Sequence, residues 1–351
     1  MEQQQQQRRI VTLESVAERA GVSVKTASNA VNGTGRMAVD TRSRVLAVID
    51  ELGYRPNIAA RNLTLGRTGA ISLAIPTFKA AYLAEVAEAF VERARSLDLV
   101  AYVSTYPDDG IGGCREFLRR FNPQVADGAV VILPELEHLD EGDFDVDFPL
   151  VCLGTRSTHG RADLVTTDHV TDARTAAAYL LARGSSSIAV VGARTTFNAE
   201  AIAGAEEGNA ELRLRGVQDA LRAAGRPLDP RLVGVTGHDW TIGAGFRATR
   251  DAIASGVPFD GLVCLNDGLA IGAISALREH GLRVPDDVQV IGFDNIEESA
   301  YLAPPLTTMD SRIEWIARTA LERLLARVER RDEPVARTFA RTQLIARGTT
   351  R

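Results

Sequence analysis

The chain of 351 residues is longer than the usual single domain of about 100 to 200 residues, so we expect two or three domains. Hydrophobic residues make up 45% of it and charged residues 25%, which is typical of globular proteins and excludes a largely disordered chain. No apolar run approaches the roughly 20 residues that cross a bilayer, and the N-terminal segment lacks the apolar stretch of a secretory signal. The three cysteines lack CxxC spacing, which argues against a disulfide framework or a zinc site and favours a reducing cytoplasm.

Charge is distributed unevenly along the chain. Residues 8–67 carry ten Lys or Arg and five Asp or Glu, a net charge of +5, whereas the rest carries 30 basic and 41 acidic residues, a net charge of −11. A basic segment of this size can neutralise several phosphates of a nucleic acid, and an acidic remainder stays off the duplex. The same segment could instead be an ordinary solvated helical surface, so charge alone leaves both interpretations open.

In chain order, the first elements form a small helical head. Residues 1–9 are rich in glutamine and have no apolar face to bury, so we expect a disordered tail. From 10 to 56 the apolar spacing is helical, with interruptions at Gly21 and at Gly33–Gly35, which predicts three short helices. Residues 57–67, which follow Pro56, predict one more short helix that connects the head to the rest of the chain.

The first two helices have the spacing of a helix-turn-helix. Thr12 is the expected N-cap of a helix over 13–20, and Ser23 is the expected N-cap of a second helix over 24–32. The second helix has a small or apolar face and an opposite polar face, with Ala27, Ala30 and Val31 against Lys25, Asn29 and Asn32. Lys can donate to guanine, Asn can bridge adenine, and the methyl groups of Val24 or Thr26 can contact thymine in a major groove. A helical hairpin with a solvated polar face is the alternative for this pattern taken alone.

After Ala70 the sequence changes to short apolar runs that alternate with longer segments of helical period, which predicts parallel α/β architecture. Strands buried on both faces are expected at 70–75, 100–104, 128–133, 150–153, 187–191, 232–235, 261–265 and 288–292. Residues 68–351 hold too many such units for one sheet, so we expect two lobes with a ligand cleft between them. We place the first lobe at about 68–165 and 296–325, and the second at about 166–295 and 326–345.

Two stretches of the head carry a specific pattern: TLESVAERAGVSVKTASNAVNG from Thr12 and TRSRVLAVIDELGYRPNIAARNL from Thr41. They resemble the head and hinge of the lactose-repressor (LacI/GalR) family of transcription regulators. The resemblance implies sequence-specific binding to a near-palindromic operator in double-stranded DNA, most commonly for repression. The residues that it implies at the DNA are Thr12, Ser23, Val24, Lys25, Thr26, Ser28, Asn29, Asn32, Tyr54, Asn57, Ala60, Arg61 and Leu63.

By the same resemblance, residues 57–67 are a hinge helix that orders on DNA. Leu63 stands where the family inserts a leucine into the minor groove, and an apolar wedge there unstacks a base step and bends the duplex. Without the family context, Leu63 is equally an ordinary buried helix residue. Asn29 stands where an arginine is common, so the operator sequence itself is not implied.

The resemblance continues through the body, in RLRGVQDAL from Arg213, LNDGLAIGAISALREHGLRVPDDVQVIGFDN from Leu265 and PPLTTMD from Pro304. It implies a body similar to periplasmic sugar-binding proteins, in which Arg213, Asn266 and Asp294 bind a polyol effector. Asn266 and Asp294 follow predicted strands, at the carboxyl ends where open α/β sheets bind ligands. Trp240 and Tyr82 could offer flat apolar faces to a sugar ring or a base.

Each of these residues also has a purely structural interpretation. Trp240 and Tyr82 could serve packing alone, and Arg213 with Asp294 could form a structural ion pair. Asp267 is expected to cap the helix that follows it. Because Gly154 stands where many relatives carry Asp, the effector stays unidentified.

Two other functional classes fit less well. An enzyme is not expected, because the chain has no Walker A loop, HExxH or GxSxG motif, and no cofactor or metal is implied. A secreted solute-binding receptor without a DNA function matches the body but not the helical head. We therefore expect a cytoplasmic, nucleoid-associated homodimer with a small all-α helix-turn-helix head and a two-lobed α/β body of the periplasmic-binding-protein type. It would act as a repressor, or alternatively as an activator, under control of a small sugar-like or nucleoside-like molecule.

Overall fold

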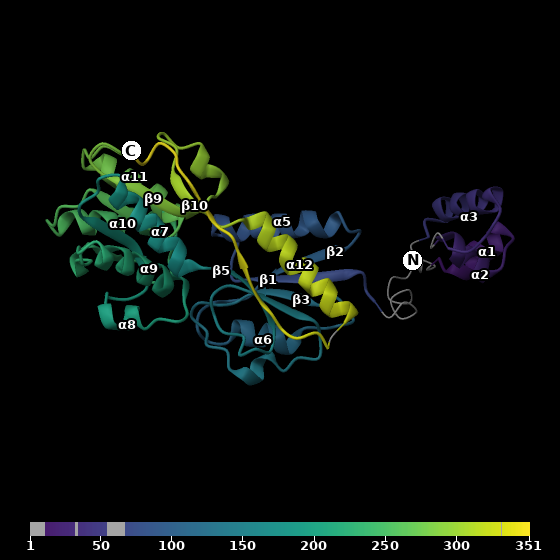
Figure 1. The fold of residues 1–351 in the computed structure, drawn as a ribbon. Helices are drawn as coiled ribbons and strands as arrows, with labels where there is room; N and C mark the ends of the chain where they lie inside the picture. The colour runs from purple at the N-terminus through teal and green to yellow at the C-terminus, as the bar shows by residue number, and fades with distance from the viewer. Residues whose placement is uncertain (1–10, 32–33, 55–66, 331) are drawn as a thin grey trace, which may run out of the picture. The chain divides into compact units, whose positions relative to one another are not determined.

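The computed structural model describes residues 11–31, 34–54, 67–330 and 332–351. They divide into two compact units, with the division between Thr68 and Gly69 (Figure 1). The tail predicted at 1–9, and the hinge helix predicted at 57–67 apart from Arg67, lie outside the described residues. The head and the body are therefore described separately.

Three helices make up the described part of the head: α1 (Leu13–Ala20), α2 (Val24–Val31) and α3 (Val39–Leu52). Gly21 ends α1 at a φ of +66°, a left-handed conformation that glycine adopts without strain from a Cβ. The three helices pack around a small apolar core that includes Val16, Ala27 and Val45. The Arg44 guanidinium donates to the carbonyl of Ala20 and ties α3 to the end of α1. The predicted helix-turn-helix is confirmed.

The first sheet of the body has six strands, all parallel. Its order is β11 (Arg337–Ala340), β5 (Asp163–Thr167), β4 (Leu150–Leu153), β3 (Ala129–Ile132), β1 (Ala70–Ile75) and β2 (Val100–Thr105). Helices α5 (Ala81–Arg95) and α12 (Ile313–Glu329) pack on one face, and α6 (Gly113–Arg120) on the other (Figure 1). Successive side chains alternate between the faces: Ile71 and Leu73 belong to the core under α5 and α12, whereas Ala74 belongs to the core under α6.

The second sheet also has six strands, and its edge strand β12 runs antiparallel to β10. Its order is β12 (Gln343–Ile345), β10 (Thr307–Asp310), β9 (Gln289–Asp294), β8 (Gly261–Cys264), β6 (Ile188–Ala193) and β7 (Val233–Val235). Helices pack against it in two pairs, α7 (His169–Ala182) with α9 (Asn209–Ala223), and α10 (Ile242–Ala254) with α11 (Asp267–Glu279). Shorter helical segments are α8 (Ala199–Ala203), η1 (Glu141–Phe144), η2 (Pro230–Leu232) and η3 (Glu297–Ala300). The two sheets, parallel except for β12, confirm the predicted fold class. The strands β2 and β7 were expected to be buried on both faces, but they are edge strands and carry exposed side chains at Val100, Tyr102 and Val235.

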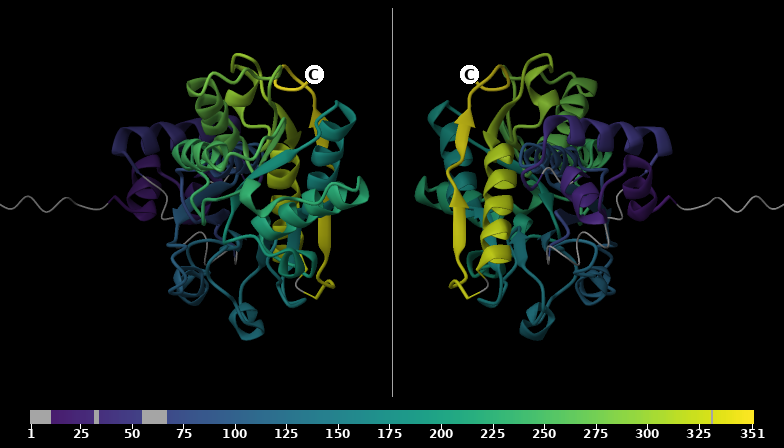
Figure 2. Two further views of the ribbon diagram at one scale, coloured as in Figure 1. Left: turned by 90° about the vertical axis from the view of Figure 1, so that its left-hand side faces the viewer. Right: turned by 90° about the vertical axis from the view of Figure 1, so that its right-hand side faces the viewer.

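The chain passes between the two lobes three times. The crossings lie at Asp168 between β5 and α7, at Ser311–Arg312 between β10 and α12, and at Arg341–Thr342 between β11 and β12. The C-terminal stretch runs extended along both lobes beside α12 (Figure 2). The crossings correct the predicted lobe boundaries, because β10 lies in the second sheet and β11 in the first. The prediction failed there because the crossings are one or two residues long and carry no Gly or Pro.

A buried carboxyl group lies beside the third crossing. Asp172 of α7 is 7% exposed, and the Thr342 hydroxyl donates to its Oδ1. Burial raises the pKa of Asp172 to about 6, and the hydrogen bond from Thr342 opposes this only in part. The carboxyl group therefore holds its proton more tightly in the folded protein than in the unfolded chain. The free energy of unfolding consequently falls as pH rises from about 4 through about 6.

We expect Asp172→Asn to remove this pH dependence, because the amide keeps an acceptor for Thr342 and carries no charge. At pH 8 the variant should be more stable than the parent by up to about 3 kcal/mol, and below pH 4 the two should converge. Urea unfolding followed by circular dichroism from pH 3.5 to 8 measures the difference. Asp251→Asn, at an exposed position of α10, is the control. A parent protein with no loss of stability across this range would contradict the prediction.

Candidate functional site

Helix α2 turns one face to the core of the head and leaves the other accessible. Ala27 and Ala30 are buried against the other helices, whereas Val24 is 42% exposed and Lys25 is also exposed. The exposed pair lies in the first turn of the helix, the part that contacts base edges when such a helix enters a major groove. Ser28 is half-buried, one turn further along. The faces are those that the helical spacing predicts.

Three of the residues predicted at the DNA form the N-terminal ends of helices. Thr12 Oγ1 accepts a hydrogen bond from the Ser15 N–H at 3.4 Å and caps α1. Ser23 Oγ accepts one from the Thr26 N–H at 3.1 Å, and the two hydroxyl groups are 2.9 Å apart. These bonds fix where each helix begins and therefore orient the exposed turn of α2.

Asn29 and Tyr54 are less exposed to solvent than the prediction that they contact DNA would suggest. Asn29 Oδ1 lies 3.5 Å from the Thr34 hydroxyl that donates to it, and a Cβ on Gly35 would come within 2.7 Å of Nδ2. Asn29 is thus packed on the turn that follows α2. Tyr54 is half-buried against the apolar core of the head. Their contacts with DNA stay predictions.

Five further residues predicted at the DNA, Asn32, Asn57, Ala60, Arg61 and Leu63, lie outside the described residues. The minor-groove wedge assigned to Leu63 and the phosphate contact assigned to Arg61 therefore also stay predictions.

In the body, a cavity of about 640 Å³ lies between the two lobes. It is lined by all five residues predicted to bind an effector, namely Tyr82, Arg213, Trp240, Asn266 and Asp294. Tyr82 comes from α5 of the first lobe, and the other four come from the second lobe. The volume is within the range of small-molecule sites.

Arg213 of α9 is the buried centre of the polar wall. Its guanidinium bonds Asp294 Oδ1 at 3.3 Å and also donates to the carbonyl of Leu265. Its Nε donates to Nδ1 of His169 at 3.1 Å, so each of the three guanidinium nitrogens makes a hydrogen bond. The ion pair considered from sequence is therefore formed, and it lies in the wall of the cavity.

Asp294 ends β9 at a φ of +105°, a strained conformation for a residue with a Cβ. Besides Arg213, the hydroxyl of Ser311 donates to its Oδ1 at 3.2 Å. Burial raises the pKa of Asp294, and the positive charge of Arg213 opposes this shift. Because Ser311 lies at the second crossing, this hydrogen bond links the ion pair to a segment that joins the two lobes.

Asn266 and Trp240 also belong to the polar wall of the cavity, and hydrogen bonds fix the position of both. Asn266 Oδ1 accepts a hydrogen bond from the Leu269 N–H at 2.8 Å and caps α11, and its Nδ2 donates to the carbonyl of Trp240 at 3.1 Å. The indole N–H of Trp240 donates to the carbonyl of Gly192 at 3.0 Å, and the Arg213 guanidinium lies 5.6 Å from its ring. Both residues are thus oriented before any ligand arrives.

The cap expected from Asp267 is a wrong prediction, since Asn266 supplies it. Asp267 is fully buried and instead accepts hydrogen bonds from the Thr308 hydroxyl at 2.7 Å and from the Ile296 N–H at 3.1 Å. Burial raises the pKa of Asp267 well above its ordinary range, and the charge of Asp294 raises it further. Asp267 lies behind the wall of the cavity, where its hydrogen bonds stabilise the loop after β9.

The two lobes contribute unlike walls to the cavity. The first lobe supplies a group of apolar side chains, Tyr82, Leu83, Ile132, Leu133, Leu153, Val165 and Ile316, together with the charged residues Lys79, Asp108 and Glu135. The second lobe supplies mostly polar ones, including His169, Arg194, Asn209, Arg213, His238, Asp239, Asn266 and Asp294. Burial and the nearby Asp294 raise the pKa of the Tyr82 hydroxyl, which therefore keeps its proton. The arrangement suits a ligand with one apolar face and one face of hydrogen-bonding groups.

Sequence reasoning missed many of the polar lining residues, among them Glu135, His169, Arg194 and Asn209. Glu135 and Arg194 follow β3 and β6 within a few residues, at the carboxyl ends of parallel strands. The rule that indicated Asn266 and Asp294 could also have found them. His169 and Asn209 begin α7 and α9, and no signal of residue type distinguishes them from other helix starts.

Comparison with known proteins accounts for both units. Residues 12–57 match the bacterial regulatory proteins of the lacI family, and residues 177–350 match a periplasmic binding protein-like domain. The chain is 30% identical to the HTH-type transcriptional regulator AscG of Escherichia coli, over 94% of this chain and 96% of AscG. This chain belongs to the lacI family of bacterial regulatory proteins. The lacI-family chain is also 31% identical to the HTH-type transcriptional repressor PurR of Pectobacterium atrosepticum, over 92% of each protein.

Solved structures of the lacI family agree with this assignment. A LacI-type transcription regulator from Bifidobacterium animalis subsp. lactis is 33% identical, with a TM-score of 0.76 over 80% of this chain and 99% of that one. The lac repressor dimer bound to operator and the anti-inducer ONPF is 26% identical, with a TM-score of 0.82 over 97% and 99%. The protein is a DNA-binding transcriptional regulator with an effector-binding body, and its curated relatives are regulators rather than enzymes. Among the described helices of this lacI-family chain, none has the length and apolar character needed to cross a membrane.

Proposed function

We propose that this regulator is a homodimeric repressor that binds a near-palindromic operator and responds to a sugar or related polyol held between its lobes. The observation that carries the proposal is the gathering of all five predicted effector residues in one interlobe cavity. The Arg213 to Asp294 ion pair in that cavity is bonded to Ser311 at a crossing between the lobes, so a ligand there acts on the joint itself. A repressor of this kind works on the chromosome, in the cytoplasm.

The unlike walls support a carbohydrate as the ligand. A sugar ring has an apolar face and a rim of hydroxyl groups, which matches the apolar group around Tyr82 in the first lobe and the polar side chains of the second lobe. Trp240 offers a flat ring beside the Arg213 guanidinium. Two relatives of similar fold are described with such ligands, the lac repressor bound to ONPG and the regulator CelR in complex with cellobiose.

In the proposed mechanism, α2 of each protomer reads one half-site through Val24, Lys25 and their neighbours. Dimerisation is supported by the lac repressor dimer, which the chain resembles over nearly its whole length. Effector binding changes the geometry of the lobes and thereby the order of the hinge segment on DNA. The mechanism requires only that the effector binds one arrangement of the two lobes more tightly than the other.

Lys25→Ala is expected to weaken operator binding about tenfold to a hundredfold, because it removes an exposed donor to a base edge. Fluorescence anisotropy with labelled operator and with random DNA measures both affinities. Arg119→Ala, which removes one exposed positive charge from the body, is the control and should leave both unchanged. An equal loss on operator and random DNA would assign Lys25 to the phosphates instead of the bases.

The experiment that tests the whole proposal is selection of genomic fragments by the purified chain at two salt concentrations, followed by titration of the bound fragment with a panel of sugars. Enrichment of one near-palindrome, and release of the protein by one sugar, are the expected results. Enrichment only when a sugar is present would replace induction by corepression, and transcription that rises on binding would make the protein an activator. Failure to enrich any fragment, with sugar binding intact, would favour a solute-binding receptor and overturn the proposal.

A further inference from the structure

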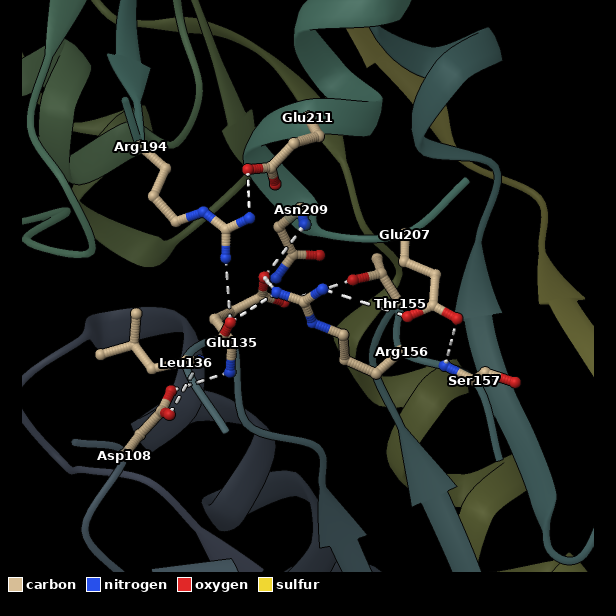
Figure 3. A network of polar contacts seen from close by, with 10 residues as sticks. All are labelled: Asp108, Glu135, Leu136, Thr155, Arg156, Ser157, Arg194, Glu207, Asn209 and Glu211. Carbon is tan, nitrogen blue, oxygen red and sulfur yellow. Dashed lines mark hydrogen bonds and ion pairs between the residues drawn. The ribbon is translucent and has the colours of Figure 1, made fainter. Parts of the chain in front are cut away.

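Helix α9 of the second lobe begins without a cap of its own. Its N-cap residue is Gly208, which has no side chain to offer and lies at a φ of +90°. The carboxylate of Glu135, from the first lobe, takes this place, because its Oε2 accepts a hydrogen bond from the Asn209 N–H at 3.3 Å (Figure 3). A carboxylate at a helix N-terminus satisfies an open N–H group and interacts favourably with the helix dipole.

The first lobe holds Glu135 in the capping position. The N–H groups of Glu135 and Leu136 donate to the two carboxylate oxygens of Asp108 at 2.8 and 3.0 Å. The Thr155 hydroxyl donates to Glu135 Oε1 at 3.2 Å, and Arg156 lies 3.5 Å from Oε2. Four contacts within one lobe therefore aim the carboxylate at the other lobe, and capping needs no rearrangement.

Further bonds cross between the lobes on both sides of Glu135. Arg194 of the second lobe donates to the carbonyl of Glu135 at 3.1 Å. Glu207, also of the second lobe, accepts a hydrogen bond from the Ser157 N–H at 3.2 Å and lies 4.0 Å from Arg156. Figure 3 shows Arg194 reaching Glu135 from the second lobe, and Glu207 of the second lobe beside Arg156 and Ser157 of the first. The cluster joins charged groups that would each be solvated if the lobes separated.

This cluster forms a wall between two cavities. The effector cavity is lined by Glu135, Arg194 and Asn209, and a second cavity of about 720 Å³ is lined by Arg156, Ser157 and Glu207. A ligand in the effector cavity therefore meets the same groups that bond one lobe to the other.

We propose that Glu135 is a capping switch: it caps α9 across the cleft when the lobes are closed, and opening of the lobes breaks this cap. The inference rests on the proposed function, since a ligand held near Arg194 and Asn209 would shift the balance between the two states. Glu137 shows the same chemistry inside one lobe, because its carboxylate accepts from the N–H groups of Cys114 and Arg115 at 2.8 and 3.1 Å and caps α6. Two glutamates two residues apart thus cap helices of different lobes.

The test is the distance between the lobes in the full chain, without DNA or sugar. Arg95→Cys on α5 and Ala203→Cys on α8 place one spin label on each lobe, and excess unlabelled chain dilutes any pairs between protomers. The three native cysteines are buried, and burial raises the pKa of Cys114 to about 12, so they compete poorly for the label. Double electron–electron resonance then gives the ratio of open to closed lobes.

Glu135→Ala is expected to raise the ratio of open to closed lobes roughly fivefold, the effect of losing one N-cap. Glu137→Ala removes a cap inside one lobe and should leave the ratio unchanged. Glu207→Gln is a second, milder variant that should also favour the open state, with the exposed neighbour Glu206→Gln as its control. The proposal is overturned when each variant gives the same ratio as its control.

Operator binding by the parent chain, measured on the same preparation, separates this inference from the proposed function. A parent that binds its operator, with no effect of Glu135→Ala on the lobes, overturns the switch alone. A parent that binds no operator, either with or without sugar, overturns the proposed function, and the distance measurement still decides whether Glu135 holds the lobes together.

Discussion

Arg213→Ala is expected to lower the free energy of unfolding of the body by about 3 to 5 kcal/mol, because it leaves a buried carboxylate without its cation. Arg213 and Asp294 are each 5% exposed, so the carboxylate is poorly solvated once its partner is removed. The carbonyl of Leu265 and Nδ1 of His169 lose their donor at the same time. Urea denaturation followed by circular dichroism measures the loss.

The same variant should bind its operator as the parent does without effector, because the head is a separate compact unit. It should no longer respond to the effector, since the residue at the centre of the polar wall is gone. Fluorescence anisotropy with labelled operator, with and without the releasing sugar, measures both properties. A response like that of the parent would remove Arg213 from the binding site.

Arg250→Ala is the matched control, since it removes an exposed arginine of α10 that lies 3.8 Å from Glu279. An exposed ion pair contributes little, and the stability should change by less than about 0.5 kcal/mol. Equal stability of the two alanine variants would mean that Asp294 finds other partners or a proton when Arg213 is absent, and the buried pair would lose its structural role.

Gly272→Ala is expected to destabilise the body by about 3 kcal/mol or more, through overpacking between α10 and α11. A Cβ at this position would lie 1.9 Å from the carbonyl oxygen of Ile242, and a backbone atom cannot move aside as a side-chain end can. Local propensity predicts the opposite sign, because alanine in a helix interior is better than glycine by about 1 kcal/mol. The thermal midpoint of unfolding shows which effect is larger.

Gly243→Ala, on the facing helix, separates propensity from packing. The nearest atom to its added Cβ is a guanidinium nitrogen of Arg247 at 3.3 Å, the far end of a flexible side chain. This variant should therefore keep the propensity gain of up to about 1 kcal/mol. If both glycine variants were stabilised, the close approach of α10 and α11 would not be a constraint on the fold.

Sequence patterns predicted the strands that are apolar along their whole length and missed those that are not. β3 and β4 are buried on both faces and appear as continuous apolar runs. β5 begins at Asp163, whose buried carboxylate accepts from Arg327 at 2.8 Å, a partner that is far away in the sequence. β10 is mostly polar and β12 is three residues long. Tertiary hydrogen bonds, which no local pattern reveals, make these segments strands.

The residues of the site that lie at the carboxyl ends of single strands could be predicted from the sequence. The family resemblance indicated Arg213, Asn266 and Asp294, and the position of the last two at strand ends supported it. Trp240 and Tyr82 were indicated by their aromatic rings, and all five residues line the cavity. Glu135 could not be given its role, because its importance comes from a helix in the other lobe that lacks a cap. Contacts between lobes depend on how closed the two sheets are, and this is set by no local sequence feature.

The three crossings also have a consequence for how the body is made. During synthesis the first sheet acquires five of its strands early, but its covering helix α12 and its edge strand β11 are translated only after β10 of the second sheet. The second sheet is likewise completed only by β12, three residues beyond β11. Neither lobe can therefore mature on the ribosome before the other, and a nascent chain stopped before residue 313 leaves the apolar face under α12 uncovered. Both lobes become complete together, once residues 313–345 have been translated, which takes a few seconds at roughly 5 to 20 residues per second.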